Sequence, residues 1–380
     1  MTDQTSQEIG FNNNLRVGKR KLHVQTVFLA KEKKATSSVF ENGRLIDKRE
    51  TAFDSAAADL EKEVKQFHQL VLSDLEMLFF VQDKVEQSKI PDSIQKLGVL
   101  FLEKGFIDEA VEQLRNAVKM DPDLPNCFLN LGQALFRKGE YSQALENLMK
   151  SAERNPDYPD VHLAIGKCHW QMGDYPLAIS TVQKALDLNP DYHEAYFTLG
   201  LILLKSKTEV PKHVDLKPPI ERIKDAELHL RKAISLSKEY DLKLMEEAFE
   251  KLKLRDKEEA GYNLFLQASQ THHWVSPSSI ADQEFYLKFM FSSLDRDNKA
   301  LDHFLRTIEK SIEKNPEYAD LHKSLGTAYL IKCWHFFTLA VEEHRRAVQI
   351  NPAFEKAVNH LKLLENDSRG FLILLQALLK

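Results

Sequence analysis

Apolar residues between positions 91 and 238 recur at the three- and four-residue spacing that predicts amphipathic helices. The stretch 125–158 shows the pattern most simply, because it holds two apolar stripes separated by Gly139. Glycine accepts the left-handed backbone geometry that often ends a helix, so the first helix should stop there. Pro156 should end the second, since proline cannot continue a helix. Neither helix can bury its stripe alone, so the pattern predicts helix pairs that depend on their neighbours.

The pair of stripes recurs at a step of 34 residues. A fixed period of this size indicates a stack of repeated units rather than a set of compact domains. The residues that keep the step are Gly98, Gly132, Gly166 and Gly200, then Pro122, Pro156 and Pro190, and finally Ala110, Ala144 and Ala178.

The order of residue types within each unit resembles the tetratricopeptide repeat, a helix–turn–helix of 34 residues. The first unit carries Leu97-Gly98, Ala110 and Pro122 in the positions of that pattern, and the third departs from it only at His162 and His169. The resemblance implies a mainly α fold, a helix–turn–helix solenoid. It also implies a non-catalytic scaffold or adaptor that holds a protein or peptide partner.

The N-terminal and C-terminal parts of the chain predict other structures. Asn42-Gly43 lies between strand-like runs and favours a β-hairpin. A small meander is marginal alone, so it should pack on the following helix, a partner or a second copy. In chain order, the predicted regions are a flexible tail (1–20), a three-stranded β-meander (21–54), an amphipathic linking or capping helix (55–90), regular repeat units (91–238) with an insertion at 205–220, irregular helical repeats (239–318), a last repeat unit with a closing helix (319–366), and an apolar C-terminal helix (367–380).

The resemblance also assigns a partner-binding surface. In tetratricopeptide repeats the second, fifth, ninth and twelfth residues of each unit line the concave side. These positions are Asn126, Leu129, Gln133 and Phe136, then Asp160, Leu163, Lys167 and Trp170, and then Glu194, Phe197, Leu201 and Leu204. Helical spacing independently places the apolar members on one face, which suits an amphipathic helix or an apolar peptide. Alternatively, the chain fills its own groove with residues 55–89 or 370–380, or neighbouring first helices cover these positions.

Composition and motifs narrow the function further. The net charge of −5 and the absence of aromatic residues among the N-terminal basic ones give no support to nucleic-acid binding. No phosphate-binding or nucleophile motif occurs, and His272-His273 has no second ligand pair, so we expect no catalysis, cofactor or metal. Three unpaired cysteines and the lack of a leader or a long apolar run suggest a cytoplasmic protein without a transmembrane segment.

Two other functions stay open. The chain could be a structural homo-oligomer or assembly factor, joined through residues 22–53 or 370–380. More remotely, it could be a regulatory subunit of an enzyme complex.

Overall fold

The computed structural model describes residues 9–17, 20–30, 32–53, 57–209, 216–237, 240–254, 258–269 and 319–378, with isolated helical positions between 283 and 313. The chain divides into two compact units. One combines Met1–Leu97 with Val275–Lys380, and the other is Gly98–Trp274.

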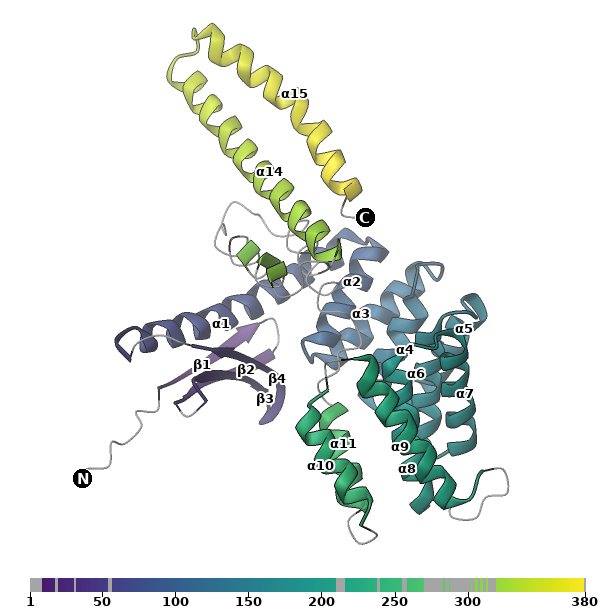
Figure 1. Cartoon of the computed structure of the whole chain (residues 1–380). Helices are drawn as coiled ribbons and strands as arrows, with labels where there is room; N and C mark the ends of the chain where they lie inside the picture. The colour runs from purple at the N-terminus through teal and green to yellow at the C-terminus, as the bar shows by residue number, and fades with distance from the viewer. Residues whose placement is uncertain are drawn as a thin grey trace, which may run out of the picture. The chain divides into compact units, whose positions relative to one another are not determined.

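The N-terminal part of the first unit is a four-stranded antiparallel sheet in the order β1-β2-β3-β4 (Figure 1). The strands are β1 (Gly10–Val17), β2 (Arg20–Leu29), β3 (Lys34–Glu41) and β4 (Arg44–Ala52). Asn42 and Gly43 have φ values of 49° and 79° and link the paired residues Glu41 and Arg44. The predicted hairpin is therefore confirmed, because both of its central residues adopt positive φ.

Strand β1 corrects two expectations, a flexible tail over 1–20 and a sheet of three strands. It pairs with β2 from Gly10 opposite Val27 to Val17 opposite Arg20. Its three successive asparagines have low strand propensity, which hid the strand in the sequence. Contacts distant in the chain stabilise it instead.

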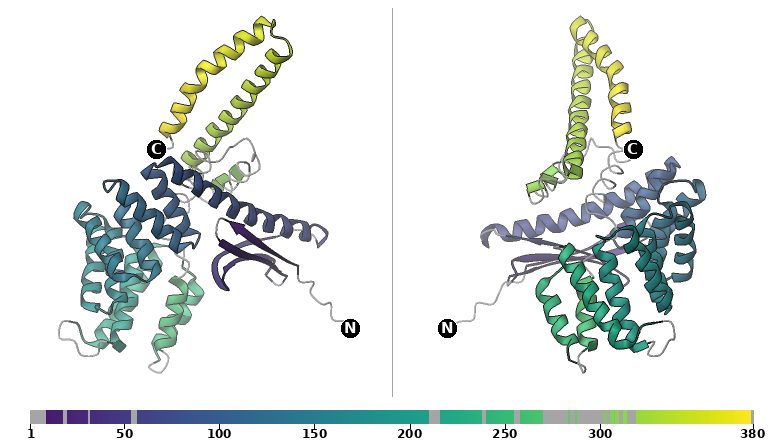
Figure 2. Two further views of the ribbon diagram at one scale, coloured as in Figure 1. Left: turned by 180° about the vertical axis from the view of Figure 1, so that it is seen from behind. Right: turned by 45° about the vertical axis from the view of Figure 1, so that its right-hand side comes forward.

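Helix α1 (Ala57–Ser88) packs against one face of the sheet (Figure 2). Val64 is fully buried there with Phe28 and Ala35. The amphipathic helix predicted over 55–90 as a linking or capping element thus packs its apolar side against the sheet. Along this layer His68 is also buried, and it joins α1 to two strands through its side chain.

The His68 imidazole lies in a buried polar network. Its Nε2–H donates to Asn13 Oδ1 at 2.9 Å, and its Nδ1 is hydrogen-bonded to Thr26 Oγ1 at 2.8 Å. Phe11 stacks on the ring, with centroids 5.9 Å apart. Burial lowers the pKa of His68, because the cation loses its hydration.

We expect acid to destabilise this sheet–helix layer through His68. The unfolded chain binds a proton near pH 6.5 and the folded one only at lower pH, so stability is full above that value and is lost as the pH falls through it. Denaturant unfolding followed by circular dichroism should show a steeper loss between pH 7.5 and 5 in the native chain than in His68→Gln. Equal pH slopes would contradict a role for this histidine.

The second unit consists of helices in consecutive antiparallel pairs, as the solenoid prediction requires (Figures 1 and 2). These helices are α2 (Pro91–Glu103), whose first residues belong to the other unit, α3 (Ile107–Met120), α4 (Cys127–Lys138), α5 (Tyr141–Arg154), α6 (Pro159–Gln171), α7 (Tyr175–Leu188), α8 (His193–Glu209), α9 (Pro219–Leu236), α10 (Leu242–Leu252) and α11 (Glu258–Ser269). The described helices of the whole chain include none that is long and apolar enough to cross a membrane.

The two helices of each regular repeat unit are in close contact at the periodic glycine. A Cβ atom on Gly132 would lie 2.6 Å from Leu148 Cγ and 3.2 Å from the Ala144 carbonyl oxygen. The fourth pair repeats this geometry after its insertion, because a Cβ atom on Gly200 would lie 2.6 Å from Leu230 Cγ. Only glycine fits such a contact without displacing the partner helix.

A second set of glycines ends the first helix of the regular units. Gly105, Gly139 and Gly173 have φ values of 79°, 86° and 81°, which favour glycine strongly. The fourth unit has no glycine at the corresponding place, and α8 accordingly continues to Glu209, into the stretch predicted as an insertion.

The last predicted repeat unit (319–366) does not form a helix–turn–helix. Residues 319–350 form one continuous helix, α14 (Ala319–Ile350), and α15 (Glu355–Leu378) joins the predicted closing and C-terminal helices. Nothing between Tyr329 and Ala340 is a glycine or proline, so no residue stops the first helix. The two helices pack side by side in every view (Figures 1 and 2). The predicted features at 270–282 lie outside the described residues.

A matched pair of glycine substitutions tests the close contact. Gly132→Ala should lower the free energy of unfolding by about 1–3 kcal/mol, because the methyl group overpacks against Leu148. Gly326→Ala in α14 meets nothing within 4 Å and should raise it by about 0.5–1 kcal/mol. Thermal and denaturant unfolding measure the free energy of unfolding of both variants. An unchanged value for Gly132→Ala would show that the helix contact has room for a methyl group.

Candidate partner-binding surface

The predicted partner-binding residues lie on one row of helices, α4, α6 and α8, in which α4 contacts α6 and α6 contacts α8. Asn126 precedes α4 as its N-cap and has a left-handed φ of 58°. Burial divides the twelve residues into two groups. The buried group is Leu129, Gln133, Leu163, Phe197, Leu201 and Leu204, and the group with exposed surface is Asn126, Phe136, Asp160, Lys167, Trp170 and Glu194.

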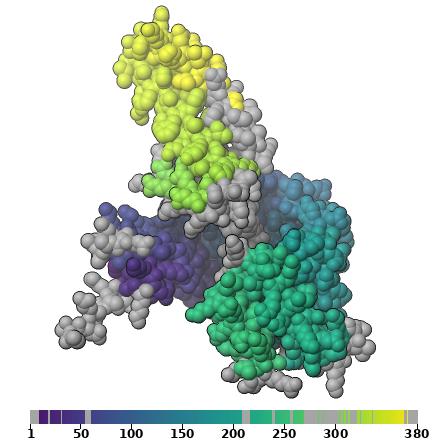
Figure 3. Space-filling model, viewed as in Figure 1, coloured from purple at the N-terminus to yellow at the C-terminus, as the bar shows by residue number. Residues whose placement is uncertain are grey.

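Neighbouring helices bury the apolar part of this row. Phe197 is 2% exposed and stacks on Tyr240, with ring centroids 4.9 Å apart and an interplanar angle of 17°. The same cluster includes Met245 and Phe249 of α10 and Phe265 of α11. In the space-filling view the green atoms of α9–α11 lie against the teal atoms of the preceding repeats (Figure 3). Sequence reasoning missed Tyr240, which precedes a helix pair without the repeat pattern.

The other predicted residues of this row on α6 and α8 are polar. Lys167 Nζ lies 2.5 Å from Glu194 Oε1, so these two predicted residues form an ion pair between consecutive units. Burial, assisted by the charges of Glu194 and Asp160, raises the pKa of Tyr192 above its usual value. The charges of Lys167 and Glu194 offset each other, while the Asp160 side chain is exposed on the surface.

An aromatic strip follows the ends of α4 and α6. Phe136 and Trp170 occupy equivalent positions in consecutive units and keep part of their surface exposed. The Phe136 ring lies 5.4 Å from that of Tyr141, and Trp170 packs on the buried cluster. Both aromatic rings are thus partly covered by packing within the second compact unit.

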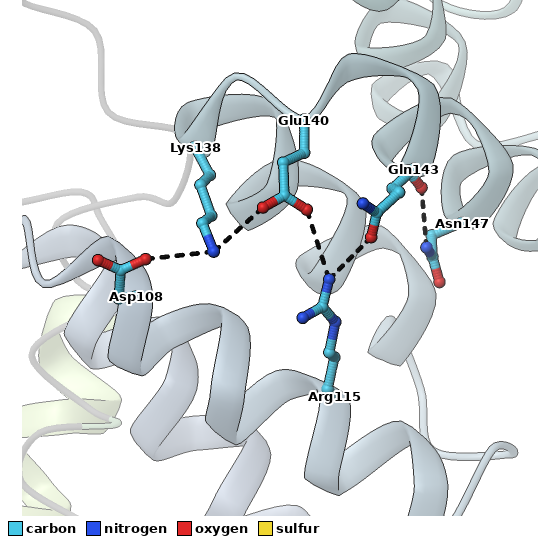
Figure 4. Close-up of polar contacts among 6 residues, drawn as sticks. All are labelled: Asp108, Arg115, Lys138, Glu140, Gln143 and Asn147. Carbon is cyan, nitrogen blue, oxygen red and sulfur yellow. Dashed lines mark hydrogen bonds and ion pairs between the residues drawn. The ribbon is translucent and has the colours of Figure 1, made fainter.

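Polar side chains of the first two repeat units contact one another (Figure 4). Lys138 Nζ bridges Asp108 at 3.2 Å and Glu140 at 3.1 Å, and these two carboxylates raise the pKa of Lys138. Arg115 Nη2 donates to Gln143 Oε1 at 2.8 Å and lies 3.4 Å from Glu140. Since α3 carries Asp108 and Arg115, this network links the first repeat unit to the second.

Two other side chains of the third repeat unit, His162 and Cys168, are buried. His162, which departs from the repeat pattern, is 4% exposed and its Nε2 lies 2.7 Å from the Pro156 carbonyl oxygen. Burial raises the pKa of the Cys168 thiol to about 12, so it is protonated at neutral pH. Among the residues that the structure describes, no group of three His, Cys, Asp or Glu side chains is placed to hold a metal ion. The pair His272-His273 falls outside them.

A family model described as TPR repeat matches residues 98–139 and 132–173, and one described as Tetratricopeptide repeat matches 163–208. Residues 98–208 are tetratricopeptide repeats. These repeats support a general role as a protein-interaction scaffold, while the N-terminal sheet has no family match.

No curated protein sequence matches this chain. Among solved structures, a crystal structure of MamA is 20% identical, with 48% of this chain and 96% of that chain covered and a TM-score of 0.35. A structure of MamA 41-end from Desulfovibrio magneticus RS-1 is 19% identical, with coverage of 49% and 98% and a TM-score of 0.36. Likenesses at this level carry no argument about function.

Truncation of Phe197 should separate a core role from a binding role. Phe197→Ala should lower the free energy of unfolding by about 3–5 kcal/mol, because it opens a cavity against Tyr240. Met149→Ala, at a position 53% exposed on α5, should change it by no more than about 0.5 kcal/mol. Calorimetry measures the unfolding of both variants. An unchanged free energy of unfolding in Phe197→Ala would show that Phe197 does not contribute to the core.

Proposed function

We propose that the tetratricopeptide repeats form a non-catalytic scaffold that binds a helical or extended segment of a partner protein. The segment lies along the row of first helices α4, α6 and α8, here called the inner row. The observation that carries the proposal is the pair of exposed strips. Phe136 and Trp170 form the aromatic strip, and Asn126 and Asp160 form the polar one. The two residues of each strip occupy equivalent positions in two consecutive repeat units.

The spacing of the strips suits a helix. The second and twelfth residues of a unit are ten residues apart, which corresponds to about 15 Å along an α-helix. A partner helix with a diameter of about 10–12 Å fits between them. Its apolar side would meet Phe136 and Trp170, and its polar side Asn126 and Asp160. The three free cysteines Cys127, Cys168 and Cys333 support a reducing, cytoplasmic setting for this role.

Site-specific photo-crosslinking tests the surface directly. A benzophenone amino acid placed at Asp160 should capture a partner protein in cells, because this side chain is exposed on the inner row. The same group at Met149, exposed on the second helix of its unit, should not capture it. Equal capture from both positions, or crosslinks from Asp160 only to residues 55–89 or 370–380 of the same chain, would refute partner binding by this surface.

Trp170 should act as an affinity anchor. Trp170→Ala should weaken the binding of a captured partner by about 2 kcal/mol or more, because large aromatic residues dominate such interfaces. Isothermal titration calorimetry measures the loss, and thermal melting confirms that the variant is folded. Unchanged affinity in a folded variant would remove Trp170 from the binding surface.

A further inference from the structure

A cavity of about 250 Å³ lies between four helices of the second unit, α8, α9, α10 and α11. Leu204, Ile223 and Leu252 supply its apolar lining, and Tyr262 adds an aromatic ring. Its volume is below the range of about 300–1,000 Å³ that is typical of small-molecule sites. It suits a single large side chain better than a whole ligand.

The cavity continues the aromatic strip of the inner row. Leu204 is the twelfth residue of its unit, the position that Phe136 and Trp170 occupy in the two preceding units. Trp170, Leu204 and Tyr262 belong to one hydrophobic cluster. A segment that lies along the aromatic strip would therefore reach the cavity next.

Charged side chains surround the opening, and most of them are already engaged. Lys207 forms an ion pair with Glu258, and Lys205 Nζ lies 5.5 Å from the centroid of the Tyr262 ring. Glu259 is exposed at the edge of the cavity. Within the part of the chain that the structure describes, Glu259 forms neither an ion pair nor a hydrogen bond. The opening thus presents one carboxylate that a cation can approach.

We infer that this cavity is the anchor pocket for one large apolar side chain of the partner segment, with a Lys or Arg of that segment beside it on Glu259. The inference rests on the proposed function and specifies its partner. The apolar lining selects a side chain such as Leu, Met or Phe, because burial of that side chain supplies affinity. The carboxylate selects the adjacent cation and sets the orientation of the segment.

Peptide selection on the full-length chain provides the probe. A phage-displayed random peptide library, panned against the immobilised protein, should yield peptides in which a large apolar residue has a Lys or Arg within two positions. One such peptide, labelled with a fluorophore, is then titrated by fluorescence polarisation. A library that yields only peptides without this pair would overturn the inference.

Two substitutions test the pocket with that peptide. Ile223→Phe should fill the cavity and weaken binding by at least about tenfold, and replacing the apolar residue of the peptide by Ala should then cost little more. Glu259→Lys should weaken binding by about threefold, and a peptide with Glu in place of its cation should recover it. Glu259 is a surface position, so this arm stands even if Ile223→Phe does not fold.

The controls distinguish the failure of the pocket from the failure of the whole surface. Met149→Ala should bind the peptide as the native chain does. If Trp170→Ala abolishes binding while Ile223→Phe and Glu259→Lys leave it within twofold, the proposed function stands and the anchor pocket is refuted. If Trp170→Ala is also without effect, both are refuted. A photo-crosslinker at Leu252 that captures only the chain itself would assign the cavity to self-occupation and refute the pocket.

Discussion

The close approach of two helices at a periodic glycine is the contact on which the repeat unit depends. At Gly132 the helix backbone meets Leu148 with no space for a side chain, and Gly166 meets Val182 in the same way. This contact sets the distance between the two helices of a unit. The apolar stripe left on the far side of each pair then needs the next unit, and stacking follows from that need. The row formed by the first helices α4, α6 and α8 is a consequence of this geometry.

A second constraint decides how many such units form. A helix ends where a residue tolerates left-handed backbone geometry, as Gly139 and Gly173 do. Residues 319–350 keep several positions of the repeat pattern, but Cys333 stands where the regular repeat units have the helix-ending glycine, and the stretch forms one uninterrupted helix. Gly326 consequently has no close neighbour for its Cβ position. Core periodicity without a stop signal therefore gives a long helix rather than a repeat.

The proposed binding surface depends on what the neighbouring helices leave uncovered. Six of the twelve residues assigned to the inner wall by resemblance are buried, and Phe197 contributes to the core through Tyr240. What stays accessible is an aromatic strip and a polar strip, with an apolar cavity beyond the aromatic one. Such an arrangement favours a few anchor contacts over a broad apolar groove, which is how most protein interfaces distribute their affinity.

The sequence by itself determined the repeat period, the helix pairs over 98–208 and the Asn42-Gly43 hairpin, because each of these depends on local backbone preference and on spacing within one unit. Only the tertiary structure decided that residues 10–17 form a strand, since its asparagine-rich sequence is stabilised by pairing with β2 and by His68. It also decided which inner residues are exposed. Burial is set by partners far along the chain, and no local pattern encodes them.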